Sequence, residues 1–201
     1  MKQSNSIEDI RTYYLSRLSE IELHCANSNT IWIFVDIVIF MAALAKVVSS
    51  HKYPKINKDD MFEFIEFIYT YLPAGYHKIR LDARHKLYIY ENGSFIEKTT
   101  ATCFPAIMYK VLRCGLVHSL SVNHCKYGRY IALANNNEVS ENLSVVQTRH
   151  NTKCVVFVAE RMITDLKCAI ERIYKQAATN KSFATRIIQQ FAKIDPIKSN
   201  Y

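Results

Sequence analysis

The feature that most limits the fold of this 201-residue chain is an apolar run at residues 30–49, TIWIFVDIVIFMAALAKVVS. A membrane-spanning helix needs about 20 mostly apolar residues, and this run has that length. However, Asp36 and Lys46 lie at interior positions, where a bilayer strongly disfavours charge. The run therefore predicts a central helix buried on most sides in a soluble domain, and no membrane partner. A buried Asp36 would then need a partner of its own.

Apolar residues at steps of three and four predict further helices. They lie at about residues 6–25, 60–72, 101–114, 159–177 and 181–193. Ser6 is the expected N-cap of the first of these helices, with acidic residues following it.

A different pattern occupies residues 127–158, where alternating and β-rich stretches predict a small antiparallel element of two or three strands. The predicted fold class is therefore mainly α, a helical bundle with a small antiparallel β excursion before the final helices. Few glycines and prolines interrupt the chain, so we expect one domain over residues 1–201, with the β element as a hairpin-type insertion.

The net charge of +8 favours a polyanionic partner such as nucleic acid, although a solubilising surface explains it equally well. One segment, residues 76–86, combines basic residues with tyrosines, a mixture that can hold phosphates and stack bases. A solvated loop is the alternative interpretation of that segment. The first ten residues lack the apolar core of a signal peptide, which predicts a cytoplasmic protein. No glycine-rich phosphate loop or Cys-x2-Cys pair occurs, so no cofactor or metal is expected.

The one pattern that points to chemistry is Arg113 followed five residues later by His118, within LRCGLVHS. An imidazole titrates near neutral pH and can move protons, and a guanidinium matches the geometry of a phosphate. Along a straight α-helix, five residues turn through ~500°, which leaves the two side chains ~140° apart. Either Gly115 breaks the helix between them, or two protomers combine their residues into one site. The purely structural interpretation is a helix that ends normally, with Gly115 as its left-handed C′ residue.

Helices leading into Arg-x4-His resemble the HEPN domains, the nucleotide-binding helical bundles of higher eukaryotes and prokaryotes. Tyr109, one turn before the Arg, and the long apolar second helix are similar to members of that family. The resemblance implies a metal-independent endoribonuclease, with Arg113 stabilising the phosphate and His118 transferring protons, whose products carry a 2′,3′-cyclic phosphate. The residue after the Arg is commonly Asn, Asp or His in active members, whereas Cys114 stands here.

The resemblance also implies partners. It predicts a homodimer whose two motifs face each other across a cleft, a toxin–antitoxin or phage-defence setting, and a cognate antitoxin or regulatory protein. RNA is expected to contact the basic and aromatic residues Lys78, Arg80, Arg84, Tyr109, Lys110, Lys126 and Arg129. Two alternatives stay open. One is a non-catalytic HEPN-fold protein that binds nucleotide or RNA, and the other is a structural helical protein that binds a protein partner.

Overall fold

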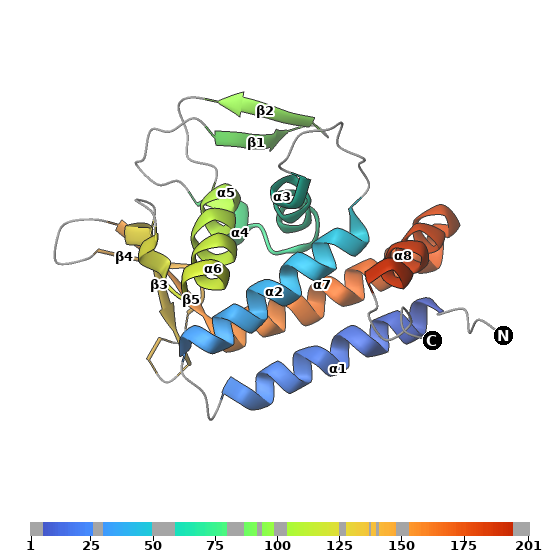
Figure 1. Cartoon of the computed structure of the whole chain (residues 1–201), viewed down its shortest axis with the longest axis horizontal. Helices are drawn as coiled ribbons and strands as arrows, with labels where there is room; N and C mark the ends of the chain where they lie inside the picture. The colour runs from blue at the N-terminus through green and yellow to red at the C-terminus, as the bar shows by residue number, and fades with distance from the viewer. Residues whose placement is uncertain are drawn as a thin grey trace.

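The computed structural model describes residues 6–25, 30–49, 59–79, 87–91, 94–98, 104–124, 128–136, 138–139, 141–147 and 153–194. The chain is mainly helical, with a small three-stranded sheet before the final helices, as the sequence predicted. Long helices form the body, and the sheet lies at one end of it (Figure 1). The division into a single domain stays a prediction.

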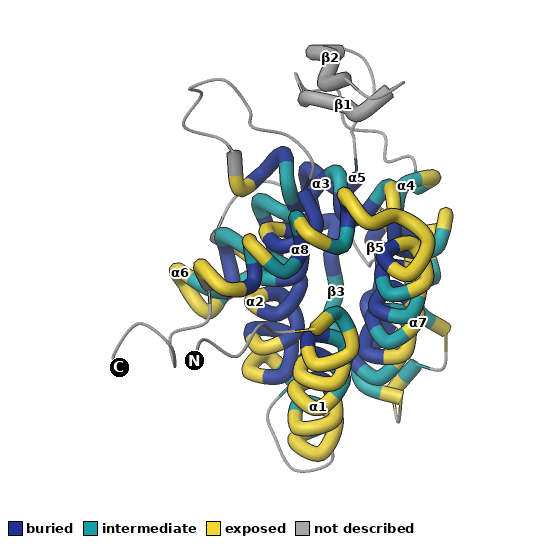
Figure 2. The backbone as a smooth tube through the Cα atoms, turned by 90° about the vertical axis from the view of Figure 1, so that its right-hand side faces the viewer, coloured by how far each residue is buried: buried dark blue, intermediate teal, exposed yellow. Residues whose placement is uncertain are grey.

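Helix α1 spans Ile7–Cys25, and Ser6 caps it as expected. The Ser6 backbone N–H donates to Asp9 Oδ2 at 2.8 Å, and the Asp9 N–H donates to Ser6 Oγ at 3.1 Å. Two otherwise unpaired donors of the first turn are thereby satisfied. One side of α1 packs on the body through Ile10, Tyr14 and Leu18, and its outer side is exposed (Figure 2).

Helix α2, Thr30–Val48, is the central helix that the apolar run predicted. It is the one helix among the described residues that is long and apolar enough to cross a membrane, and 61% of its apolar window is buried inside the protein. Neighbouring elements of the protein therefore shield most of this apolar surface from water. The expectation of a buried Asp36 is wrong, because Asp36 and Lys46 lie on a narrow side of α2 that the other elements leave exposed.

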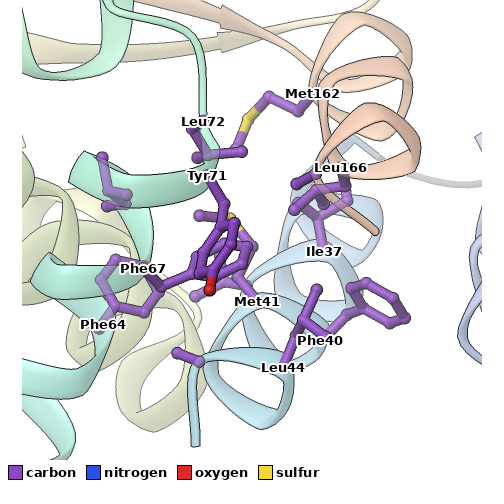
Figure 3. Close-up of a cluster of buried hydrophobic side chains, with 14 of the residues drawn as sticks. Ile37, Phe40, Met41, Leu44, Phe64, Phe67, Tyr71, Leu72, Met162 and Leu166 are labelled. Carbon is purple, nitrogen blue, oxygen red and sulfur yellow. The ribbon is translucent and has the colours of Figure 1, made fainter. Parts of the chain in front are cut away.

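The core is built where α2 meets α3 (Asp59–Tyr71) and α7 (Ala159–Thr179), and α8 (Lys181–Ile194) packs on α2 and α7. Met41 of α2, Phe67 of α3 and Leu166 of α7 are among the buried side chains that meet there (Figure 3). Their burial follows from apolar stripes repeating at helical spacing on each of the three helices. These helix bounds lie within two residues of the predicted ones.

The three-stranded sheet consists of β3 (Ile131–Ala134), β4 (Ser144–Gln147) and β5 (Lys153–Val158) in the order β3-β5-β4. Strand β5 is antiparallel to β4 but parallel to β3, so the predicted purely antiparallel element is wrong. The parallel pairing is possible because the chain between β3 and β5 is long enough to contain β4 and return. A second pair of strands, β1 (Leu87–Glu91) and β2 (Ser94–Lys98), is antiparallel and was not predicted.

A polar network joins the sheet end of the molecule to α7. The short helix α4, Gly75–Lys78, buries Tyr76, whose hydroxyl donates to Asp165 Oδ2 of α7 at 2.8 Å. The side-chain amide of Asn142 donates to the same hydroxyl at 2.8 Å, and its Oδ1 accepts from the Val158 N–H at 3.0 Å. Tyr76 is 1% exposed, so the network replaces hydrogen bonds that water would otherwise supply.

Candidate functional site

The Arg-x4-His motif lies on one continuous helix with an unusual middle. Helix α5 (Phe104–Met108) leads directly into η1, a π-helix over Tyr109–Leu116, and then into the short helix α6 (Val117–Ser119). The helix therefore runs past Gly115, which is buried inside it and neither breaks nor caps it. The left-handed residue at its end is Leu120, with φ 50°. The expected helix end at residue 114 is thus wrong, and residues 101–103 of the expected helix lie outside the described residues.

The π-helix explains how Arg113 and His118 meet on one helix although they are five residues apart. In an α-helix, residues five apart point ~140° away from each other. The i→i+5 hydrogen bonds of a π-helix turn the chain less per residue and so bring such residues closer to the same side of the helix. Arg113 Nη1 accordingly lies 3.0 Å from His118 Nε2. The pair meets within one chain, without a broken helix and without a second protomer.

The guanidinium sets the direction of this hydrogen bond. Its nitrogens can only donate, so Nε2 of His118 is the acceptor in this contact. His118 is exposed, whereas the Arg113 side chain is only 25% exposed. A solvent-facing base therefore lies against a partly covered cation, an arrangement suited to a phosphate that approaches from solution.

Arg113 has two further neighbours. Its Nη2 lies 3.7 Å from Asp60 Oδ2, at the start of α3, and its guanidinium carbon lies 5.8 Å from the centre of the Tyr109 ring. The Asp60 side chain is 57% exposed, and an ion pair of this kind contributes only ~0–1 kcal/mol. A bound phosphate could replace this carboxylate at small cost.

Tyr109 lies beside the same cation and is half-buried. Its ring packs edge-on against Phe64 of α3, with ring centres 5.6 Å apart. Burial raises the pKa of Tyr109 to about 12, and the neighbouring Cys114 acts in the same direction, while Arg113 opposes it. Tyr109 therefore stays a neutral phenol at physiological pH, able to donate a hydrogen bond and to present a ring, but unsuited to act as a base.

Of the other predicted RNA-binding residues, only Lys78 and Lys110 have described side chains. Lys110 follows Tyr109 on the π-helix and is half-buried, and Lys78 is exposed at the end of α4. Arg129 belongs to the short 3₁₀ helix Gly128–Tyr130, where only its backbone is described. The remaining three, Arg80, Arg84 and Lys126, lie outside the described residues.

The structure thus joins Arg113, His118 and Tyr109 and adds Asp60, at the start of α3. No local pattern links Asp60 to a motif so far along the chain, so only the packing of α3 on the motif helix reveals the contact. Among the described residues, no group of three or more His, Cys, Asp or Glu side chains could hold a metal ion.

Comparison of the chain with protein-family models, with curated proteins and with solved structures finds no match. The class that the fold and the site define is therefore a mainly helical protein with an Arg–His pair on a π-helical turn.

Proposed function

We propose that this protein binds RNA at the Arg113–His118 pair and cleaves it as a metal-independent endoribonuclease of the HEPN type. The observation that carries the proposal is the 3.0 Å contact between Arg113 Nη1 and His118 Nε2, produced by the π-helix. A cation and a proton carrier adjacent to each other are what cleavage at a phosphodiester requires.

In the proposed reaction, a phosphate of the RNA displaces Asp60 and takes the hydrogen bonds of Arg113. This releases Nε2 of His118, which accepts the proton of the neighbouring 2′-hydroxyl. The 2′-oxygen bonds to phosphorus as the bond to the 5′-oxygen breaks, and the imidazolium returns its proton to that leaving oxygen. The products are a 2′,3′-cyclic phosphate and a 5′-hydroxyl, and Arg113 stabilises the extra negative charge on the phosphorane.

Other features support an RNA partner. The net charge of +8 attracts a polyanion, and the ring of Tyr109 lies beside the cation, where an unstacked base can be held. A homodimer, a toxin–antitoxin or phage-defence setting, a cognate antitoxin and a cytoplasmic location belong to the same proposal and rest on the HEPN resemblance.

A second candidate function is RNA or nucleotide binding without cleavage. One observation favours it: Cys114 stands after Arg113, where active HEPN members commonly carry Asn, Asp or His.

The test is incubation of purified protein with total RNA in EDTA, using wild type, Arg113→Ala and His118→Ala. His24→Ala is the matched control, because His24 is an exposed histidine at the end of α1. Cleavage by wild type and His24→Ala alone supports the proposal. Equal cleavage by all four proteins indicates a contaminant or another site.

Absence of cleavage by all four proteins rejects the endoribonuclease, and a binding measurement then separates what remains. Fluorescence anisotropy with a single-stranded RNA at several salt concentrations reports whether affinity falls with salt, as phosphate contacts require. Salt-dependent binding that Arg113→Ala weakens supports the second candidate. No binding leaves the structural, partner-binding class.

A further inference from the structure

The exposed side of α2 carries a regular seam of five residues: Trp32, Asp36, Ile39, Ala43 and Lys46. Successive members are four, three, four and three residues apart, which is the heptad spacing by which helices pack side by side. Trp32 is 54% exposed and Ile39 is 49% exposed, although both lie on the most apolar helix of the chain. The seam extends over ~21 Å of helix.

Exposed apolar side chains are concentrated on α2 and on the neighbouring α1. Of the large hydrophobic residues that are exposed in the described chain, Tyr13, Leu23, Ile31, Trp32 and Ile39 belong to α1 and α2. In Figure 1, α1 runs along the lower edge of the molecule and α2 crosses the body above it. The two helices are in contact, and a groove of about 370 Å³ opens between them. Such a concentration of exposed apolar surface marks an interaction site.

The order of charges along the seam identifies the partner, and we infer that it is the same seam on a second copy of this chain. When two copies of α2 are paired antiparallel about a two-fold axis at position 41, Asp36 of each lies opposite Lys46 of the other. The same register sets Ile39 opposite Ala43, so that the larger side chain of each copy meets the smaller one of its partner. Antiparallel packing across a two-fold axis repeats each of these contacts twice.

The charges exclude the parallel alternative. Parallel pairing in register would place Asp36 against Asp36 and Lys46 against Lys46, and like charges in an interface are strongly unfavourable. Neither Asp36 nor Lys46 has an ion pair with another described residue. The two charges are therefore available to a partner.

This interface is distinct from the motif, and therefore from the homodimer with facing motifs that the HEPN resemblance implies. The charge reversals on α2 separate the two, because they would leave a motif-to-motif dimer unchanged. The motif helix packs on α2 but leaves the seam exposed, and Arg113 contacts His118 within one chain. The inference goes beyond the proposed function and does not depend on it, since a protein that never touches RNA could associate through α2.

The test is the molecular mass of the full chain in solution, measured by sedimentation velocity over a range of concentrations. Wild type is expected to be a dimer at micromolar concentration. Asp36→Lys alone and Lys46→Glu alone each replace two attractive pairs by two repulsive ones, and each should weaken the dimer by at least ~10-fold in Kd. The double variant Asp36→Lys/Lys46→Glu restores opposite charges in this register and should recover the wild-type Kd within a few-fold.

Lys175→Glu, the same charge change on the exposed side of α7, is the matched control and should leave the dimer intact. All of these side chains are exposed, and circular dichroism will confirm that each variant folds. A monomeric wild type overturns the inference and leaves the seam to another partner, such as a helix of a different protein or a lipid surface. A dimer that both single variants leave unchanged, or that the double variant fails to restore, also overturns it.

Discussion

Tyr76→Phe tests the polar network that joins α4 to α7, because it removes one hydroxyl and leaves the ring in place. That hydroxyl donates to Asp165 at 2.8 Å and accepts from Asn142 at 2.8 Å, at a residue that is 1% exposed. Leaving buried groups without their partner costs ~1–3 kcal/mol. Taking ~2 kcal/mol, a chain of this size should lose about 4–8 °C in Tm.

The loss should depend on pH in a defined direction. Burial raises the pKa of Asp165, and the hydrogen bonds from Tyr76 and Asn142 partly oppose this. Between the ordinary pKa of an aspartate and this raised value, the folded state binds more protons than the unfolded state, so stability falls as pH rises. Removing the Tyr76 hydroxyl raises the folded pKa of Asp165 further. The free energy lost in Tyr76→Phe should therefore be larger at about pH 7 than at about pH 4, where a larger share of the Asp165 carboxyl is protonated.

Urea unfolding of wild type and variant at both pH values measures this difference. Tyr13→Phe is the matched control, because Tyr13 is 43% exposed and its stability should change by less than ~0.5 kcal/mol. A Tyr76→Phe loss that is the same at both pH values, or larger at the acidic one, would refute the assignment of the Tyr76 hydroxyl as the donor to an ionised Asp165.

The remaining predictions concern the candidate site and the frame around it. Asp60→Asn removes the carboxylate beside Arg113 and should tighten RNA binding about 2- to 5-fold in an anisotropy titration; unchanged or weaker binding would contradict displacement of Asp60 by phosphate. Gly128→Ala places a Cβ against the backbone oxygen of Val122, so it should destabilise the fold by ~1–3 kcal/mol in urea unfolding, and a neutral result would rule out this close approach. Ser6→Ala removes the cap of α1 and should cost ~1 kcal/mol by the same assay, whereas Ser6→Gly should cost only a few tenths.

The helices could be predicted from the sequence because each carries a repeating apolar stripe. In α7, Met162, Leu166 and Ile173 recur at helical spacing, and all three are buried. The cap at Ser6 was equally predictable, since it depends on residues three apart. Both features depend only on residues that are close together in the sequence.

The features that were missed depend on contacts between distant segments or on small shifts of the backbone. The direction of β3 relative to β5 is set by how the chain returns to the sheet, and strand composition does not reveal it. The π-helix differs from an α-helix by one hydrogen-bond step, and residues 109–116 have no composition that distinguishes the two. For that reason the motif was found while the way in which Arg113 and His118 meet was not.

The π-helical turn has a consequence for evolutionary comparison of such chains. In a regular α-helix, residues four apart lie on the same face, so an ancestor with Arg-x3-His would present the same pair without a widened turn. Insertion of one residue, absorbed by the π-helix, would lengthen the motif to Arg-x4-His and leave both side chains where they were. Spacing in the sequence and spacing in the site can therefore diverge, because a π-helical turn absorbs one residue without moving the two side chains apart.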